Sequence, residues 1–240
     1  MNKLFLILII LSIAVTSLQA QPVGGGTDSK DSRLMIINAY SKDIFIKIDD
    51  SQGDILYQTD AMPPNDITRM FSTPEDGFYF ISYKFNEADN WTTFYDAFDD
   101  DDYMIQLKAG QVCAIIVNRY CMIDEHTLVI PDSSLPVVCF CNISPSELTR
   151  MEIGTDYMSD FVAFTTDISA NGLTDFTAID SGDYGLFWES IASTAKDEFT
   201  WLPKEDDDSI RLLPFENNNI YVFCVFDSDA NRATLFDITP

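Results

Sequence analysis

The chain has 240 residues, of which 39 are acidic and 14 are basic, so its formal net charge is −25. A field of this sign repels phosphate backbones and anionic lipid surfaces, which argues against nucleic acid as a partner and favours cations, basic partners or simple solubility. Hydrophobic residues make up 46% of the chain and aromatic residues 13%, which excludes a disordered protein and is enough for packed cores.

The N-terminus has the order of a secretory signal peptide. Lys3 gives a positive start, an apolar run extends from Leu4 to Val15, and small and polar residues lead to Ala20. The run is shorter than the roughly 20 apolar residues that a membrane span requires. We therefore predict cleavage of residues 1–20, with a retained anchor as the alternative, and no stable membrane span afterwards. The protein is expected to be exported to the periplasm, the cell surface or the extracellular medium.

Residues 21–32 are predicted to form a flexible linker, because Gly24-Gly25-Gly26 is followed by polar residues with nothing to bury. The remaining chain contains an internal repeat. Leu34–Asn38 and Val138–Asn142 are both apolar runs that end in Asn. Ile46–Ile48 and Met151–Ile153 both alternate apolar and charged residues, which is the pattern of a half-buried strand.

The strongest match in the repeat is an aromatic strand that follows a glycine. Tyr79, Ile81 and Tyr83 in the first half correspond to Tyr, Leu and Trp at positions 184, 186 and 188. Alternate residues lie on one face of a strand, and we assign this face to the core. Two further matches follow in the same order, of residues 101–107 with 206–212 and of residues 112–117 with 220–225.

The repeat predicts an all-β protein with two tandem domains. Short strands separated by Gly, Pro, Asn and Asp favour a sandwich or a barrel for each copy. The predicted organisation is a signal peptide (1–20), a linker (21–32), a first β-sandwich repeat (33–132) and a second (133–240). Two sandwiches in series would form a rod with exposed loops at each end.

Three short motifs add a family resemblance. Asn142-Ile143-Ser144-Pro145 ends one apolar strand, residues 107–112 join two later strands, and Gly77 opens an aromatic strand. In this order the chain resembles an exported bacterial family, domain of unknown function 4397, whose members often occur as tandem copies. The resemblance implies immunoglobulin- or transthyretin-like sandwich domains of unsettled role, with no catalytic residues to carry over.

Two acidic runs occupy equivalent places in the repeat and are candidate calcium ligands. Clustered carboxylates suit Ca²⁺, which takes six to eight oxygen ligands, but the spacing is not that of an EF-hand. The alternative, which we favour, is a solvated loop that protects a neighbouring strand from edge pairing. The candidate ligands are Asp99, Asp100, Asp101, Asp102, Asp206, Asp207 and Asp208.

Aromatic residues gather after the glycine-led strand of each half. Trp91, Phe94 and Tyr95 lie close together in the sequence, and Trp201 stands at a comparable place in the second half. An exposed aromatic strip would stack on sugars or anchor a protein partner. The alternative is packing between the sheets, which we favour.

Catalytic motifs are missing from the sequence. The five cysteines form no cluster with the single histidine, His126, and we interpret most of them as small buried apolar residues. The chain contains no Gly-x-Ser-x-Gly motif and no phosphate-binding glycine loop. We therefore expect no catalytic residues and no cofactor.

The function that the sequence favours is that of a non-catalytic binding or structural module of the cell envelope. Its partner would be an unknown protein or an envelope glycan. The alternative is a calcium-dependent adhesion or binding module that uses the acidic loops. A third hypothesis is a glycoside hydrolase that uses two carboxylates, although no particular pair stands out among the 39 acidic residues.

Overall fold

The computed structural model describes residues 31–73, 76–96, 101–156, 159–190, 199–204, 209–227 and 232–240. Within these ranges the chain forms strands and no helix, which confirms the predicted all-β class. The same ranges accordingly hold no helix with the length and apolar character to cross a bilayer. The predicted signal peptide and most of the predicted linker lie outside the described residues.

The strands of the first half form two sheets. These strands are β1 (Ser32–Asn38), β2 (Phe45–Asp49), β3 (Ile55–Gln58), β4 (Asp66–Ile67), β5 (Phe71–Thr73), β6 (Gly77–Lys84), β7 (Thr92–Thr93), β8 (Tyr95–Asp96), β9 (Asp101–Asp102), β10 (Met104–Leu107), β11 (Val112–Val117) and β12 (Ile123–Leu128). The first inner sheet has the order β12-β11-β1-β4, with β5 also beside β1. The first outer sheet has the order β10-β6-β2-β3, with β7 also beside β6, and β8 pairs with β9 separately.

The second half repeats this plan. Its strands are β13 (Val137–Asn142), β14 (Leu148–Asp156), β15 (Asp160–Ile168), β16 (Gly172–Leu173), β17 (Thr177–Ala178), β18 (Gly182–Ser190), β19 (Thr200–Trp201), β20 (Leu213–Phe215), β21 (Ile220–Asp227) and β22 (Arg232–Asp237). The second inner sheet has the order β16-β13-β21-β22, with β17 beside β13. The second outer sheet has the order β15-β14-β18-β19, with β20 beside β18. In each half the first strand pairs in parallel with a late one, β1 with β11 and β13 with β21.

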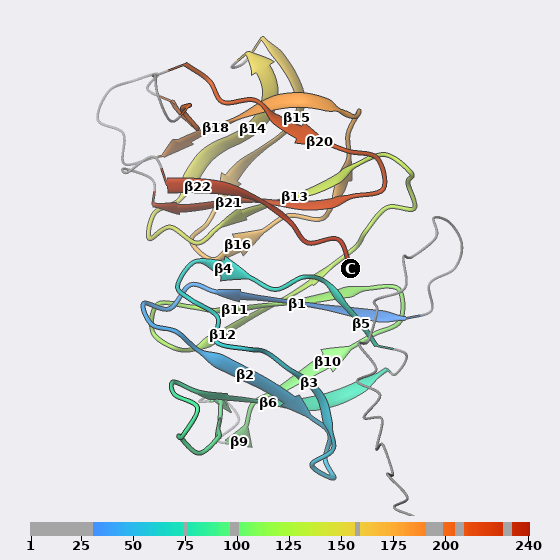
Figure 1. Ribbon diagram of the computed structural model, residues 1–240, viewed down its shortest axis with the longest axis vertical. Helices are drawn as coiled ribbons and strands as arrows, with labels where there is room; N and C mark the ends of the chain where they lie inside the picture. The colour runs from blue at the N-terminus through green and yellow to red at the C-terminus, as the bar shows by residue number, and fades with distance from the viewer. Residues whose placement is uncertain are drawn as a thin grey trace, which may run out of the picture.

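The four sheets stack in the order outer, inner, inner, outer along the long axis of the molecule (Figure 1). Each half has its own core between its outer and inner sheets. A further core, which we call the shared core, lies between the two inner sheets and takes residues from both halves. Its buried members are Met35, Ile37, Ile67, Met70, Val112, Ala114, Ile116, Leu128, Val137, Cys139, Cys141, Ile143, Phe176, Val222, Cys224 and Ile238.

The shared core exists because the central inner strands are apolar on both faces. Ile115 and Val117 of β11 point into the core of the first half, whereas Ile116 between them points into the shared core. Every residue of β11 and of β13 is buried. Continuous apolar runs of this kind are typical of strands that are covered on both sides.

The predicted rod with exposed loops at each end differs from the described part of the chain in what lies at its ends, which are the outer sheets (Figure 1). The halves stack face to face, because an inner sheet left open would expose its second apolar face to water. Backbone hydrogen bonds also join the halves: Met70 N donates to Ile238 O at 2.9 Å and Phe176 N donates to Val129 O at 3.2 Å.

The internal repeat extends to hydrogen bonds of two buried asparagines. Asn38 and Asn142 end the first strand of each half, and both are 0% exposed. Each side-chain amide donates to three backbone carbonyl oxygens: Asn38 to those of Lys42, Met62 and Pro63 at 2.9–3.0 Å, and Asn142 to those of Ser146, Ile168 and Ser169 at 2.9–3.1 Å. Each side-chain oxygen accepts from the backbone N–H two residues later. These asparagines therefore fasten two loops to the strand end in each half.

The predicted core face of the glycine-led strand is confirmed. Tyr79 and Ile81 are buried in the core of the first half, and Leu186 and Trp188 are buried in the core of the second. The match of residues 206–212 with 101–107 is wrong where it can be checked. Residues 209–212 form no named strand, and β20, which pairs with β18 as β10 pairs with β6, begins only at Leu213.

Candidate functional site

The sheet faces left free by the stack are those of the two outer sheets, which lie at opposite ends of the molecule (Figure 1). On the first outer sheet, Phe78 is 61% exposed and Met104 of the neighbouring strand is 47% exposed. We call the outward side chains of this sheet and its β7 edge the first outer face. Its members are Phe45, Lys47, Asp49, Phe78, Phe80, Ser82, Lys84, Trp91, Thr93, Met104 and Gln106.

Two lysines of the first outer face lie over aromatic rings. The Nζ atom of Lys84 lies 4.9 Å from the ring centre of Trp91 and 5.2 Å from that of Phe45. The Nζ atom of Lys47 lies 5.6 Å from the ring centre of Trp91. Lys84 Nζ also donates a hydrogen bond of 2.8 Å to the backbone oxygen of Glu87. These contacts hold the half-buried Trp91 ring at the edge of the sheet.

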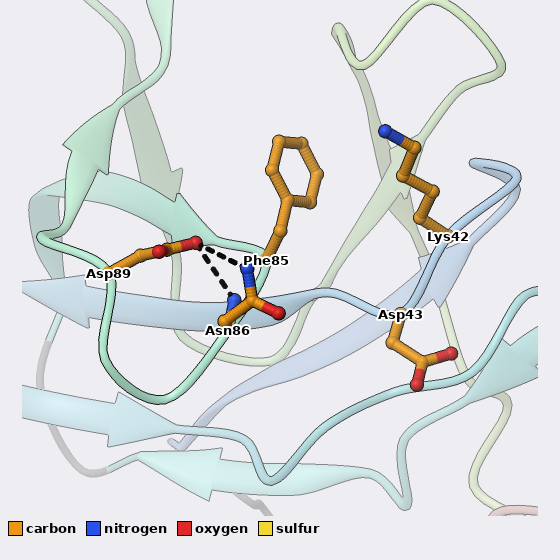
Figure 2. A pocket seen from close by; sticks show the side chains of 5 residues that line it. All are labelled: Lys42, Asp43, Phe85, Asn86 and Asp89. Atoms are coloured by element: carbon orange, nitrogen blue, oxygen red, sulfur yellow. Dashed lines mark hydrogen bonds between the residues drawn. The ribbon is translucent and has the colours of Figure 1, made fainter.

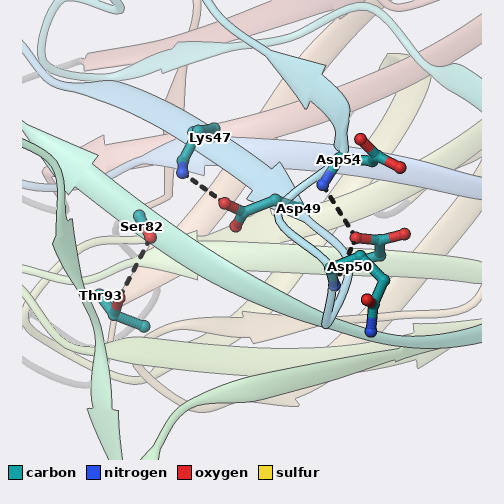
Figure 3. Close-up of polar contacts among 7 residues, drawn as sticks. Lys47, Asp49, Asp50, Asp54, Ser82 and Thr93 are labelled. Atoms are coloured by element: carbon teal, nitrogen blue, oxygen red, sulfur yellow. Dashed lines mark hydrogen bonds and ion pairs between the residues drawn. The ribbon is translucent and has the colours of Figure 1, made fainter.

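A buried carboxylate lies beside these cations. Lys47 Nζ donates to Oδ2 of Asp49, which is only 9% exposed (Figure 3). The other carboxylate oxygen, Oδ1, is buried without a hydrogen-bond partner. The hydroxyls of Ser82 and Thr93 lie 3.4 Å apart on the neighbouring strands. A buried acceptor without a donor is uncommon in folded proteins, so Asp49 calls for an explanation beyond folding.

A pocket of about 530 Å³ opens at the loop end of the first half, and Figure 2 shows the five side chains that line it: Lys42, Asp43, Phe85, Asn86 and Asp89. The Lys42 ammonium lies 5.6 Å from the ring centre of Phe85. Oδ2 of Asp89 accepts from the backbone and side-chain nitrogens of Asn86 at 3.0 and 2.9 Å. The loop that carries three of these residues leads from β6 to Trp91, and the Phe85 side chain also packs against the core of the first half. Donors and acceptors thus surround an apolar ring, as in sites for small polar ligands.

The second outer sheet presents a comparable set of outward side chains. We call Arg150, Glu152, Phe161, Phe164, Phe187, Glu189, Phe199 and Trp201 the second outer face. Arg150 Nε donates to Oε2 of the fully buried Glu152 at 2.7 Å. The Arg150 guanidinium carbon lies 4.4 Å from the ring centre of Phe164 and 5.4 Å from that of Phe161. A cation, a carboxylate and aromatic rings therefore meet on this face too.

The four predicted aromatic partner residues do not form one strip. Trp91 and Trp201 are half-buried and lie on the outer faces at opposite ends of the stack, and Tyr95 is 56% exposed on the short strand β8. For Phe94 the structure agrees with the favoured alternative, packing between the sheets, and not with partner binding. Its side chain is 4% exposed in the core of the first half, where its ring centre lies 4.4 Å from that of Tyr83. Strand alternation explains this, because Trp91 and Thr93 point outward and the residue after them points inward.

The predicted calcium ligands are only partly described. Asp101 and Asp102 are exposed on β9, whereas positions 99, 100 and 206–208 lie outside the described residues. Among the residues that the structure describes, no group of three His, Cys, Asp or Glu side chains is placed to hold a metal ion. Calcium binding by the acidic runs stays a prediction.

The cysteines and the histidine occupy structural positions. His126 Nε2 lies 2.9 Å from the backbone oxygen of Asn171, across the boundary between the halves. Cys139, Cys141 and Cys224 lie in the shared core, and burial raises the pKa of the Cys139 and Cys141 thiols well above the usual value. Burial and the Glu125 carboxylate likewise raise the pKa of Cys113. A nucleophilic cysteine requires the opposite shift.

These thiols are expected to resist labelling in the native protein. Because the thiolate is the reactive form and burial disfavours it, no more than one thiol per chain should react rapidly with a disulfide reagent at pH 8. The most accessible thiol is that of Cys121, which is half-buried and whose pKa burial also raises, so Cys121→Ser should remove any rapid reaction that the native chain shows. The measurement is the absorbance of released thionitrobenzoate, with urea-unfolded protein as the control that exposes all five. Rapid release of two or more equivalents from the native chain would contradict the buried positions.

Sequence reasoning missed the lysines of the first outer face. Lys47 and Lys84 stand at outward positions of alternating strands, a pattern that the sequence does show. Their convergence on Trp91 depends on the pairing of β2, β6 and β7, which no local pattern specifies.

No protein-family model and no curated protein sequence matches the chain. Among solved structures, one match is the family CBM26 module CBMbc of Amy13K from Eubacterium rectale, in complex with maltoheptaose. The match covers 87% of this chain and 98% of that one, at 10% sequence identity and a TM-score of 0.25. Values this low leave the two structures too different for any residue or ligand to be transferred.

Proposed function

We propose that the protein is an exported, non-catalytic binding module and that its first outer face holds an uncharged glycan. The observation that carries the proposal is the Trp91 ring, which two lysine ammonium groups fix at the edge of an open sheet. One of those lysines also pairs with Asp49, whose second carboxylate oxygen has no partner.

The chemistry of a sugar fits this mixture of groups. A pyranose ring presents apolar C–H faces that pack on aromatic rings, and hydroxyls that require both donors and acceptors. The first outer face supplies an aromatic ring in Trp91, donors in Lys84 and Lys47, and hydroxyls in Ser82 and Thr93. The pocket at the loop end of the same half holds further carboxylate, amide and ammonium groups around Phe85.

The charge of the chain favours an uncharged ligand. With a formal net charge of −25, the protein repels polymers that carry carboxylate or sulfate groups. Asp49 neutralises Lys47, which leaves Lys84 as the remaining cation among the members of the first outer face, and Asp43 and Asp89 outnumber Lys42 in the pocket. Neutral hydroxyls are the partners that such a surface binds without opposing the overall field.

The open position of the site favours binding over catalysis. Bond-breaking enzymes expel water around the reacting atoms, whereas the first outer face lies on the surface of a sheet. The polar groups are also hydrogen-bonded within the protein. On the first outer face Lys47 pairs with Asp49, and in the loop after β6 Asn86 donates to Asp89. Groups fixed in this way orient a ligand.

Removing the Trp91 ring is expected to weaken glycan binding by at least about 30-fold, the loss typical of a central aromatic contact. Affinity electrophoresis and calorimetry against neutral α-glucan, β-glucan, xylan and mannan would measure it. Trp91→Phe should retain most of the affinity, because a ring remains. Tyr120→Ala is the matched control, since this side chain is 69% exposed but lies outside the first outer face. Equal affinity of Trp91→Ala and wild type, or no binding to any of the four polymers, would refute the proposal.

A further inference from the structure

We infer that the second outer face is a second site for the same kind of uncharged glycan, so that one molecule bridges two glycan chains; this inference rests on the proposed function. Strands β2 and β14 occupy equivalent interior positions in the two outer sheets. Each carries a cation and a carboxylate two residues apart on its outward side, Lys47 with Asp49 and Arg150 with Glu152.

The two ion pairs do not occupy matching positions of the repeat. Glu152 corresponds to Lys47, because Met151–Ile153 matches Ile46–Ile48. The arrangement of a carboxylate-bound cation over aromatic rings therefore occurs twice with different residues, in the same order along the strand but two positions apart. A shared fold alone would have reproduced the same residue types at the same positions, so the recurrence points to a shared task.

Aromatic surface is available on the second outer face. Phe161 is 41% exposed and Phe164 is 48% exposed, although both rings contact Arg150. Their ring centres lie 4.9 Å apart in an edge-to-face arrangement, which gives one continuous aromatic surface on β15. Trp201 is half-buried on the same face and lies 5.8 Å from the ring of Phe199.

Charge selects the same class of ligand at both ends. Glu152 has no exposed side-chain surface and is paired with Arg150, just as Asp49 is paired with Lys47. Each outer face therefore carries a neutralised ion pair within a chain of net charge −25. Such faces complement an uncharged polymer and disfavour an anionic one.

The stack fixes the direction of the two faces. The sides of the two inner sheets that face each other are buried in the shared core. The two outer faces are therefore held at opposite ends of the molecule and point away from each other (Figure 1). A single short glycan does not reach both faces. On a long polymer or an insoluble particle, two linked sites raise the apparent affinity about 100-fold or more above that of one site.

Calorimetric titration with linear hexasaccharides of α-1,4-glucose, β-1,4-glucose, β-1,4-xylose and β-1,4-mannose tests the inference. Wild type is expected to bind two molecules of the recognised sugar per chain. Trp91→Ala and the double variant Phe161→Ala/Phe164→Ala should each bind one, and the combined variant none. Phe164→Tyr keeps a ring and should retain both sites, which separates loss of the site from loss of the fold.

The matching polysaccharides provide the readout for bridging. Wild type should make a solution of the recognised polymer turbid, and either one-site variant should abolish the turbidity while its hexasaccharide affinity stays within about threefold. One site per wild-type chain, lost in Trp91→Ala and intact in Phe161→Ala/Phe164→Ala, overturns the inference and leaves the proposed function standing. No binding of any sugar by wild type overturns the proposed function itself.

Discussion

An aspartate in place of Ile116 is expected to unfold both halves of the protein together and to lower the free energy of unfolding by more than about 4 kcal/mol. Ile116 is 0% exposed in the shared core, where residues of both halves surround it. The described residues that surround this position in the shared core are apolar, so the two inner sheets must separate to hydrate a carboxylate placed there. Separation exposes the apolar face of each sheet, and neither half keeps its packing.

Urea unfolding followed by tryptophan fluorescence would measure this effect. The chain has three tryptophans, and a Trp91→Phe/Trp201→Phe background leaves only Trp188, which is buried in the core of the second half. Its transition should move to lower urea although the substitution lies in the first half. Thr127→Asp, at an exposed position of neighbouring β12, should change the stability by no more than about 0.5 kcal/mol. An unchanged Trp188 midpoint would show that the halves unfold independently.

The substitution Asn142→Asp is expected to lower the free energy of unfolding by about 3–5 kcal/mol, although it only replaces the side-chain NH2 group with an oxygen. The Asn142 amide donates to three carbonyl oxygens at 2.9–3.1 Å, and a carboxylate would place a negative oxygen against all three. The same change at Asn38 should have a similar effect in the first half. Asn90→Asp is the control, because Asn90 is exposed.

The loss at Asn142→Asp should depend on pH. A protonated carboxyl regains one donor, so the folded variant would hold its proton more tightly than the unfolded chain, and the pKa of the new carboxyl would rise on folding. Stability relative to wild type should therefore recover as the pH is lowered from 7 toward 5, and fall as the pH rises. Denaturant unfolding at several pH values would show this. A loss below about 1 kcal/mol with no such slope would mean that the asparagine does not fasten the loops.

The all-β class and the internal repeat could be predicted because they follow from local alternation. The outward and inward sides of β6 and β18 can be read from Tyr79, Ile81, Leu186 and Trp188, since one face of each strand is apolar throughout. The same rule was available for Phe94, but residues 92–93 form too short a strand to be recognised without its partner β6.

The stacking of the halves could not be predicted in the same way. The continuous apolar run from Leu34 to Ile37 does indicate a strand that is covered on both faces, but it does not specify what covers the second face. In the structure, the inner sheet of the other half covers this second face. The sites on the outer faces depend equally on tertiary pairing, because Lys47 and Lys84 reach Trp91 only after three strands have assembled.

The buried position of Asn142 has a practical consequence for the choice of expression host. Asn142-Ile143-Ser144 is a formal acceptor sequence for N-linked glycosylation, which modifies the same side-chain nitrogen that donates to the three carbonyls. In a yeast or mammalian secretory pathway, any chain modified there would be unable to complete the second half. Mutating Ser144 is not a neutral remedy, because its hydroxyl donates to Asn142 Oδ1 at 2.7 Å. Bacterial production avoids the conflict between the acceptor sequence and the fold.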